Sequence, residues 1–353
     1  MDLKEIRRNI DLIDFMILRL LNKRAELALL TGRVKKEIED KKREREVIER
    51  VKKNSTRFLL RPEFIERLYF EMIKESKRLQ RAGYRLIAFQ GEHGSYSEIA
   101  SVMWNDKLIP MPCSRFEELF EGVERSLYDY GIVPVENSLG GRIGRVNELL
   151  LQTELKVIGA IVIPIRHCLL ALPGTELSEI RVVFSHPQAL FQCKSFIEMN
   201  SLQAIKYYDT AGAARMLMEE NIKGAGVIAN RLCASIYGLE VIKENIADHE
   251  DNMTRFFVLA KESDRDDGNM CSVIFFTEHR PGTLLQVLEI FADAGINLTR
   301  IDSIPKGHNN YAFFLDFIGS YRDAEVLKAL DLVKRITKGF KLLGCYKERR
   351  VVL

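Results

Sequence analysis

Residues 3–38, LKEIRRNIDLIDFMILRLLNKRAELALLTGRVKKEI, decide the fold of the first part of the chain. Their apolar side chains recur at alternating spacings of three and four residues, which is a heptad pattern sustained for five repeats. This stripe predicts one long helix and is too long to be buried inside one small domain. We therefore expect the helix to pack against a second copy of the chain. The stripe consists of Leu3, Ile6, Ile10, Ile13, Ile17, Leu20, Leu27, Val34 and Ile38.

Two further helices are predicted before residue 82. Residues 1–82 contain one glycine and one proline, so little interrupts helix formation. Asp40 is placed to cap a second helix that runs to about residue 53. Pro62 lies near the start of a third helix, which continues to Gln80. This segment is therefore expected to be an all-α domain.

The helical segment is basic, whereas the rest of the chain is acidic. Residues 1–82 carry 23 Lys and Arg against 15 Asp and Glu, and the remaining residues carry 30 against 35. A basic domain indicates an anionic partner. The sign of the charge leaves two partners open, a nucleic acid and a small polyanion.

Two polar residues, Arg24 and Thr31, occupy positions of the stripe where an apolar side chain is due. A buried arginine is costly unless it is paired, so Arg24 indicates a register-setting polar contact, a stem that reaches solvent, or a bound anion. Lys35 lies three helical turns beyond Arg24 on the same face. Cations in an apolar seam favour a small dicarboxylate over a duplex, because contacts to nucleic acid are exposed. The third helix adds a stripe of Tyr69, Ile73, Ser76 and Gln80.

This segment resembles the all-helical chorismate mutases. The resemblance implies an intertwined dimer whose first helices cross, so that Arg7 reaches the partner's site. It also implies arginines that hold the two carboxylates of chorismate, with Lys35 and Gln80 as donors to the ether oxygen and Glu44 as acceptor for the substrate hydroxyl. The residues that carry the resemblance are Arg7 in IRRNID, Arg24 in NKRAEL, Lys35 in GRVKKEI, Asp40 with Arg43 and Glu44, and Ser76 with Gln80.

After Gly83 the pattern changes to short apolar strands that alternate with helices. This alternation predicts an α/β fold, and its length predicts two lobes with a cleft between them. Strands are expected at 85–89, 131–135, 157–163, 168–172, 181–184 and 226–229, and helices at 98–105, 115–125, 145–153, 188–199 and 211–220.

Polar residues gather where the predicted strands end, as at Ser95, Ser138 and Ser185. Strand ends in α/β sheets commonly form ligand clefts, but each serine also fits the simpler role of a helix cap or turn residue. The glycine-rich run 140–144 precedes a predicted helix. It either cradles an anion on backbone N–H groups or forms a tight turn.

Residues 84–260 resemble prephenate dehydratases through five ordered motifs, which are GEHGSYS (91–97), VPVENSLGG (133–141), RHCLL (166–170), FSHPQALFQC (184–193) and NMTRF (252–256). The resemblance implies a two-lobed fold like the periplasmic ligand-binding proteins, with the site in the cleft. Prephenate loses carbon dioxide and hydroxide, so the site has to protonate the leaving hydroxyl and keep the ring carboxylate poorly solvated. The expected site residues are Glu136, Asn137, Ser138, Ser185, His186, Gln192, Thr254, Arg255 and Phe256.

Five of these residues have expected roles. Thr254 donates a proton to the leaving oxygen, and Glu136 or His186 relays that proton. Either Arg255 or backbone donors hold the side-chain carboxylate of prephenate, and Arg255 also fits the simpler role of a structural ion pair. Phe256 forms part of an apolar wall that favours loss of carbon dioxide.

Residues 261–269, KESDRDDGN, contain no apolar side chain and predict a linker. Residues 270–353 then predict a βαββαβ order, which is an α+β ferredoxin-like domain. The expected elements are strands at 271–277, 296–304, 311–318 and 341–346 and helices at 283–294 and 323–336.

The segments RPGTL (280–284) and GINL (295–298) resemble the ACT family. The resemblance implies a regulatory domain that binds phenylalanine between paired copies. Ile304 stands where related dehydratases usually carry an arginine, a difference expected to weaken inhibition or its transmission. The expected effector-binding residues are Gly282, Thr283, Leu284, Asn297, Leu298, Asp302 and Ser303.

The six cysteines form no CxxC pair, and the six histidines show no metal-ligand spacing. We therefore expect reduced, buried thiols and neither metal nor cofactor. No apolar run is long enough to span a bilayer, and the first residues lack a signal core. A cytoplasmic protein without membrane or nucleic-acid partners is expected.

The resemblances imply three domains, at residues 1–82, 84–260 and 270–353, in a homo-oligomer that is at least a dimer. They imply an enzyme that rearranges chorismate to prephenate and converts prephenate to phenylpyruvate under feedback by phenylalanine. Three alternatives stay open. The helical domain could serve only for dimerisation, the chain could be a non-enzymatic amino-acid sensor, or the second substrate could be arogenate.

Overall fold

Within the described ranges, no helix combines the length and the apolar character needed to cross a membrane. The chain divides into two units, Met1–Arg85 and Leu86–Leu353. Most of the predicted linker, residues 263–267, lies outside the described residues. The parts of the chain that the computed structural model describes are residues 2–262, 268–278, 280–305 and 311–351.

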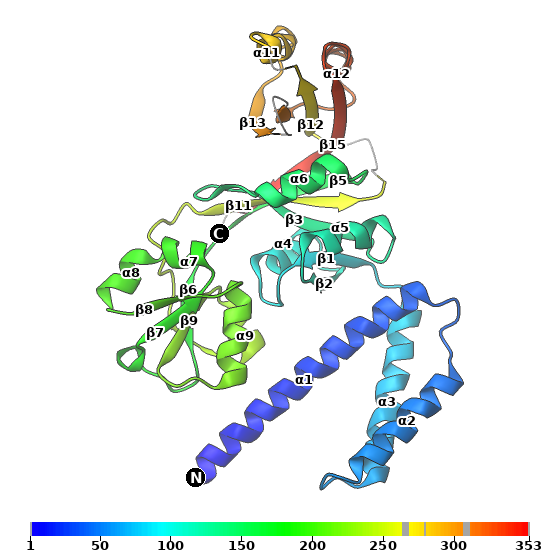
Figure 1. Ribbon diagram of the computed structural model, residues 1–353, viewed down its shortest axis with the longest axis vertical. Coiled ribbons are helices and arrows are strands. Elements are labelled where there is room, and N and C mark those ends of the chain that lie inside the picture. Colours follow the sequence, from blue (N-terminus) through cyan, green and yellow to red (C-terminus); the bar gives the residue numbers. More distant parts are fainter. Residues whose placement is uncertain (1, 263–267, 279, 306–310, 352–353) are drawn as a thin grey trace. The chain divides into compact units, whose positions relative to one another are not determined.

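The first unit consists of three helices (Figure 1), which are α1 (Leu3–Val34), α2 (Lys41–Ser55) and α3 (Pro62–Arg81). Asp40 caps α2, because its carboxylate accepts the backbone N–H of Arg43 at 2.9 Å. Pro62 opens α3, where its missing N–H costs no hydrogen bond. The predicted all-α fold is confirmed, although α1 ends at Val34, so that Ile38 is not part of it.

Helices α1 and α3 approach each other closely at Gly32. A Cβ atom at this position would lie 3.0 Å from Cγ of Gln80, which is tighter than almost all real Cβ contacts. On the same side of α1, Gln80 Nε2 donates to the carbonyl oxygen of Ala28 at 2.8 Å. The missing side chain of Gly32 therefore lets α3 pack directly against α1.

The heptad stripe of α1 remains exposed in the single chain. Its members within the helix are between 40% and 76% exposed, although a helix of a globular protein usually buries its apolar face. The first unit by itself therefore does not bury the stripe. The exposed members are Leu3, Ile6, Ile10, Ile13, Ile17, Leu20, Leu27 and Val34.

The second unit contains two sheets. The strands of the larger sheet are β1 (Leu86–Gln90), β2 (Ile109–Cys113), β3 (Tyr130–Asn137), β4 (Gly141–Arg142), β5 (Lys156–Pro164), β11 (Met253–Ala260), β12 (Met270–Thr277), β13 (Leu298–Pro305), β14 (Tyr311–Ile318) and β15 (Gly339–Arg350). Their order is β13-β14-β12-β15-β5-β11-β3-β1-β2, and β4 pairs with β3. Strand β2 was not predicted because it contains Pro110 and Pro112, which an edge strand tolerates.

Strand β15 runs through two parts of this sheet. Its first half pairs antiparallel with β12, and its end pairs parallel with β5, where Glu348 lies opposite Ala160. The predicted last strand stopped at Tyr346 and missed this second pairing. The strands of the predicted dehydratase and regulatory domains therefore form one continuous sheet.

Helices α4 (Tyr96–Trp104), α5 (Phe116–Glu124) and α6 (Gly144–Gln152) pack on the part of the sheet that contains β1 and β3. The core of this first lobe is apolar and closed, since Phe89, Ile132, Ile161 and Phe256 are buried. These residues come from four neighbouring strands, so the sheet is held by side-chain packing as well as by its hydrogen bonds.

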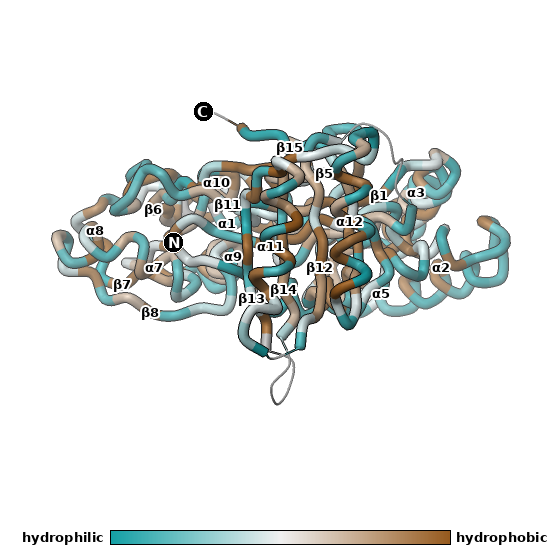
Figure 2. The backbone as a smooth tube through the Cα atoms, turned by 90° about the horizontal axis from the view of Figure 1, so that it is seen from above, coloured by the Kyte–Doolittle hydropathy of each residue, from teal (hydrophilic) through white to brown (hydrophobic). Residues whose placement is uncertain are grey.

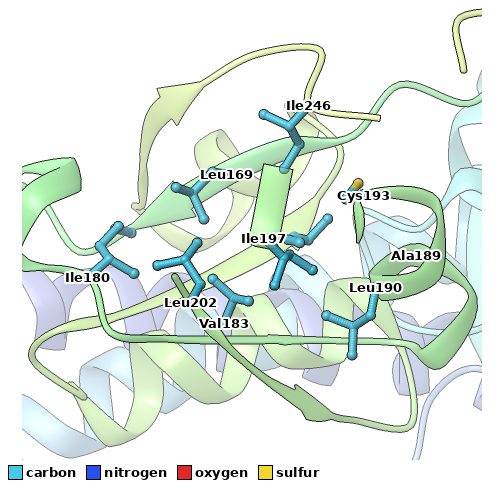
Figure 3. Packing of buried hydrophobic residues seen from close by; sticks show 11 residues of the cluster. Leu169, Ile180, Val183, Ala189, Leu190, Cys193, Ile197, Leu202 and Ile246 are labelled. Atoms are coloured by element: carbon cyan, nitrogen blue, oxygen red, sulfur yellow. The ribbon is translucent and has the colours of Figure 1, made fainter. Parts of the chain in front are cut away.

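The smaller sheet has the order β10-β6-β9-β7-β8 and forms a second lobe. Figure 3 shows its core, in which Leu169 and Val183 from the sheet lie near Leu190 and Ile197 from the helices. The helix predicted at 188–199 is two helices that meet at Cys193, whose φ of −117° is not helical. The elements of this lobe are β6 (Cys168–Ala171), β7 (Val182–Ser185), β8 (Gln203–Lys206), β9 (Ala225–Ala229), β10 (Glu240–Lys243), α7 (Pro187–Gln192), α8 (Lys194–Met199), α9 (Thr210–Glu220) and α10 (Leu232–Tyr237).

Strands β12 to β15 alternate with α11 (Thr283–Asp293) and α12 (Ala324–Ile336) in the predicted βαββαβ order. Hydrophobic residues recur along both helices (Figure 2), and Phe291 and Val333 are buried against the sheet. The expected α+β domain is thereby confirmed.

Two cysteines depart from the predicted reduced state. Cys271 on β12 and Cys345 on β15 lie opposite each other in register, with their Cα atoms 4.1 Å apart, and form a disulfide. The residues lie 74 positions apart in the sequence, so their pairing depends on the sheet. The other cysteines, Cys113, Cys168, Cys193 and Cys233, are buried thiols.

Candidate active sites

A cavity of about 290 Å³ is lined by residues from both lobes of the second unit. Its walls come from the ends of β1, β3 and β11 and from the first residues of α4, α7 and α9. Such a crevice at strand ends and helix starts is the usual position of a ligand site in α/β folds. The predicted site residues that line it are Asn137, His186, Gln192, Thr254 and Phe256.

Asn137 and Thr254 face each other across β3 and β11. The Asn137 Nδ2 group donates to Oγ1 of Thr254 at 2.9 Å, while its Oδ1 accepts the backbone N–H of Gly140 at 2.7 Å. Gln188 Nε2 also donates to this Oδ1, at 3.3 Å. Because Oγ1 of Thr254 accepts from Asn137, the hydroxyl proton remains available for another acceptor.

Arg255 and Glu136 lie on the other face of the sheet. Side chains alternate along a strand, so Thr254 and Phe256 face the cavity while Arg255 points away. Glu136 lies opposite Arg255 in the register of β3 and β11 and shares its face.

The guanidinium of Arg255 forms ion pairs with Asp316 and Glu348, each at 2.5 Å. The expectation that Arg255 holds a substrate carboxylate does not fit this position, whereas the alternative of a structural ion pair does. Glu136 is likewise absent from the cavity wall, so the expected proton relay through Glu136 does not fit either.

Two predicted serines use their hydroxyl groups on the backbone instead of the cavity. The buried Ser185 hydroxyl donates to the carbonyl oxygen of Ile228 at 2.5 Å. Ser138 donates to the carbonyl oxygen of Asp251 at 3.1 Å and accepts the N–H of Met253 at 3.0 Å. Neither serine lines the cavity, because these contacts hold strands and loops together.

Sequence reasoning missed several polar residues of the cavity wall, among them Tyr96 and His167. The imidazole of His167 lies 3.1 Å from the Tyr96 hydroxyl through Nδ1 and 2.9 Å from Oε1 of Gln192 through Nε2. Burial lowers the pKa of His167, so the ring is neutral. Both residues lie inside the motifs GEHGSYS and RHCLL, and those motifs were the available signal.

Asp209 is a further residue of the wall that was not predicted. Its carboxylate caps α9 by accepting the N–H of Gly212 at 2.8 Å. Burial raises the pKa of Asp209, and its backbone hydrogen bonds oppose that shift. In the sequence Asp209 looks like an ordinary helix cap.

The charge distribution around the cavity is unusual for a site expected to bind a dianion. None of the described residues that line it is a lysine or an arginine. Instead, α4, α5 and α9 begin at the wall with Tyr96, Phe116 and Thr210, and Ile143, which precedes α6, also lines it. The first of these is capped by Ser95, and the N–H groups of helix starts favour bound anions.

In the helical unit, the structure brings Arg24 and Ser76 together. Arg24 Nη1 donates to Oγ of Ser76 at 2.6 Å and to the carbonyl oxygen of Met72 at 3.1 Å. The amide of Gln80, which the resemblance assigns to the ether oxygen, donates to the backbone of Ala28. Because of its contacts with Ser76 and Met72, the Arg24 side chain is half-buried between α1 and α3.

The other predicted mutase residues form contacts of their own. Lys35 Nζ lies 3.9 Å from the Asp40 carboxylate, and Arg43 lies 3.4 Å from Glu46. Lys77, which was not predicted, binds Glu44 at 3.0 Å. The remaining residue, Arg7, is exposed on α1.

The predicted effector residues lie at the start of α11 and along β13. Gly282 caps α11 with a φ of 86°, a conformation that favours glycine. The Thr283 hydroxyl donates to the carbonyl oxygens of Glu278 and Arg280, and Asp302 pairs with Arg300 at 2.6 Å. Leu284 and Leu298 pack against the core, whereas Asn297 and Ser303 are exposed.

The sequence matches three family models, which are chorismate mutase type II over residues 6–81, prephenate dehydratase over residues 87–264 and the ACT domain over residues 272–331. It is 36% identical to the bifunctional chorismate mutase/prephenate dehydratase of Aquifex aeolicus, with 98% of each chain covered. It is 37% identical to arogenate dehydratase 2 of Petunia hybrida, with 78% of this chain and 73% of the relative covered.

A solved structure of prephenate dehydratase from Arthrobacter aurescens in complex with L-Phe matches with a TM-score of 0.69 and 29% identity. The match covers 74% of this chain and 89% of that chain. Together the matches define the class of protein, an enzyme that carries a helical mutase domain, a two-lobed dehydratase domain and an ACT domain. Because the similarity to the Aquifex protein spans nearly the whole of both chains, the chain belongs to the bifunctional chorismate mutase/prephenate dehydratase family.

Proposed function

We propose that the chain catalyses two successive reactions, the rearrangement of chorismate to prephenate and the decarboxylating dehydration of prephenate to phenylpyruvate. The first takes place in the helical unit and the second in the cavity lined by Thr254. The observation that carries the second assignment is the Asn137–Thr254 hydrogen bond, which leaves a hydroxyl proton available at the cavity. Membership of the family supports both assignments.

The rearrangement needs no nucleophile and no acid, so the helical unit only has to hold chorismate in a compact conformation. Arg24 binds one carboxylate, and its contact with Ser76 orients the guanidinium beforehand. Negative charge develops on the ether oxygen, where Lys35 and Gln80 donate. Gln80 has to turn from the Ala28 carbonyl to do so.

The exposed stripe of α1 supports a homo-oligomer that is at least a dimer. Eight apolar side chains of one helix face lack cover within the chain, and a second α1 with the same period buries them efficiently. Arg7, exposed on this helix, then reaches the partner's site.

In the second reaction the ring carboxylate leaves as carbon dioxide, and the electrons of the broken bond enter the ring. The carbon–oxygen bond breaks at the same time, and the departing hydroxide takes the proton of Thr254 to leave as water. Thr254 is a weak acid and needs a proton source. His186 and Asp209 line the cavity and supply candidates for this relay.

The cavity electrostatics favour this outcome. The side-chain carboxylate of prephenate binds at helix starts such as Ser95–Tyr96, while the wall offers no fixed cation to the ring carboxylate in the described residues. A cation there would stabilise the carboxylate and oppose its loss. Phe256 adds an apolar surface at the same cavity.

Phenylalanine binding to the ACT domain provides feedback control. The proposed effector residues are those at the start of α11 and on β13.

The proposed domains are residues 1–82, 84–260 and 270–353. The proposed compartment is the cytoplasm.

One observation favours a second substrate. Asp209 places a carboxyl group in the cavity wall, and arogenate differs from prephenate by carrying an ammonium group that a carboxylate attracts. Assays with prephenate and arogenate at equal concentration separate the two substrates. If Asp209→Asn loses arogenate turnover but keeps prephenate turnover, the Asp209 carboxylate binds the ammonium group of arogenate.

The central test incubates the purified chain with chorismate alone and measures prephenate and phenylpyruvate with and without phenylalanine. The expected result is phenylpyruvate as final product and its suppression by phenylalanine. Accumulation of prephenate contradicts the second activity, and unconsumed chorismate contradicts the first and supports a helical domain used only for assembly. Binding of phenylalanine without turnover of either substrate would support the alternative that the chain is a non-enzymatic amino-acid sensor.

A further inference from the structure

Arg255, the neighbour of Thr254, reaches into a buried group of polar side chains on the regulatory strands. Its Nη1 lies 2.5 Å from the carboxylate of Asp316 on β14, and its Nε lies 2.5 Å from Glu348 on β15. Its Nη2 donates to the hydroxyl of Tyr346, also on β15, at 3.0 Å. Three side chains of the regulatory strands therefore hold one side chain of the catalytic strand β11.

Asp316 continues this row of charges toward β13. It is 1% exposed and lies 3.7 Å from Nη1 of Arg300. Arg300 pairs with Asp302 at 2.6 Å, and Ser272 donates to the second oxygen of Asp316 at 2.5 Å. Asp302 is one of the proposed effector residues, so alternating charges connect that region with Arg255.

The geometry of β11 links this row to the cavity. Thr254 and Arg255 are consecutive, so a shift of the Arg255 backbone also moves the hydroxyl of Thr254. A charge left unpaired in a buried site is strongly unfavourable, and Arg255 therefore follows Asp316 when β14 moves. The ladder between β11 and β3 is irregular between Arg255 and Phe256, which makes this position easier to displace than a regular one.

We propose that Arg255 is a positioning residue that couples the regulatory domain to Thr254 through Asp316 and Arg300. This inference rests on the proposed function. Arg255 does not touch substrate, and it sets where the Thr254 hydroxyl lies in the effector-free and effector-bound states.

The experiment compares the full-length wild type with Asp316→Asn and Arg255→Lys. Dehydratase rates with prephenate are measured over a range of L-phenylalanine concentrations, and L-phenylalanine binding is measured separately by calorimetry. Circular dichroism and urea unfolding report whether the second unit of each variant is folded, because the mutase reaction takes place in the other unit. We expect both variants to bind phenylalanine with nearly unchanged affinity while the concentration that gives half-inhibition rises about tenfold or more.

Two further variants test whether a change in inhibition has another cause, such as the loss of any ion-paired arginine or a failure to fold. Arg145→Lys changes another arginine that binds two carboxylates, Glu117 and Glu148, but within the dehydratase lobe. It should leave inhibition unchanged. The double variant Arg255→Met with Asp316→Leu removes the buried pair as a unit if a single variant fails to fold. Arg300 then keeps its pair with Asp302, and Glu348, which loses Arg255, is 23% exposed. The double variant should also bind phenylalanine without inhibition.

The outcomes separate this inference from the function on which it rests. Wild-type inhibition in Asp316→Asn, Arg255→Lys or the double variant overturns the coupling while the proposed function stands. Loss of phenylalanine binding together with inhibition also overturns it, because Asp316 would then belong to the effector site. A wild-type chain that phenylalanine does not inhibit overturns both the regulation and the coupling.

Discussion

The amide of Asn137 donates to the hydroxyl oxygen of Thr254 at 2.9 Å, although the two residues are 117 positions apart in the sequence. They meet because β3 and β11 are antiparallel neighbours and place both residues opposite each other. This contact orients the threonine so that its proton points to an acceptor other than Asn137.

Replacing Thr254 by valine should therefore remove the proton donor without changing the shape of the side chain. We expect prephenate turnover to fall about 100-fold or more, the scale of a lost general acid, while chorismate turnover stays unchanged. Thr254→Ser is the matched control, because it keeps the hydroxyl and should retain most of the activity. Steady-state assays with each substrate would reject the role if Thr254→Val formed phenylpyruvate at the wild-type rate.

The Arg24–Ser76 contact predicts the complementary result in the helical unit. Arg24→Ala should lower chorismate turnover about 100-fold, as expected for a lost charge-stabilising donor, and leave prephenate turnover intact. Lys74→Ala on α3 removes a cation that is exposed and pairs with Glu71, and it should have little effect. Equal mutase rates in Arg24→Ala and Lys74→Ala would contradict the assignment.

The buried imidazole of His167 predicts a pH dependence of stability. Burial lowers its pKa below 6.5, so the folded chain keeps the ring neutral while the unfolded chain takes up a proton near pH 6.5. Folding stability should therefore decrease as the pH falls below that value, by at most about 1.4 kcal/mol per pH unit for one proton.

Urea unfolding of the dehydratase unit between pH 7.5 and 5.5 measures this slope. We expect His167→Gln to reduce the slope, whereas His249→Gln, a change at an exposed histidine, should leave it as in the wild type. An identical slope in all three chains would exclude His167 as its source.

Ser185 should behave as a structural residue despite its place in the FSHPQALFQC motif. Its hydroxyl donates to the carbonyl of Ile228 and does not reach the cavity. Ser185→Ala should lower the free energy of unfolding by about 1 kcal/mol, the usual value of one hydrogen bond, with little change in the turnover of prephenate. A large loss of turnover with unchanged stability would return Ser185 to the catalytic residues.

The stripe of α1 predicts that charge at its centre breaks the assembly. Ile13→Asp places a carboxylate among apolar side chains that should be buried between two chains, so light scattering should report a smaller particle. Leu18→Asp is the control, because Leu18 lies on α1 outside the stripe and is equally apolar. The same mass for both variants and the wild type would contradict assembly through this face.

Much of the fold follows from local patterns. The heptad spacing of α1, the cap at Asp40 and the proline at the start of α3 each depend on a few neighbouring residues, and all three were predicted. The βαββαβ order of the last domain was predicted for the same reason. The end of strand β15 beyond Tyr346 was not, because it is stabilised by β5, which lies far away in the sequence.

The candidate site was likewise predicted in part, since local motifs located it but did not show which side chains face the cavity. Ordered motifs placed Asn137, Gln192 and Thr254 near one another, because each motif marks the end of a strand or the start of a helix. They did not distinguish residues that face the cavity from their immediate neighbours. Glu136 and Arg255 were expected in the site for that reason, and Tyr96 and His167 were overlooked although they lie in the same motifs.

Residue types and their spacing were thus sufficient for most of the helices, for part of the strands and for the prediction of the two activities, because these depend on periodicity and on short motifs. The direction in which each side chain points required the folded sheet, since adjacent residues of a strand face opposite sides. The same is true of Cys271 and Cys345, and of Arg255 and Asp316, which approach each other only after their strands pair. Local sequence carries no information about such contacts, because they join segments that are brought together by burial of the shared core.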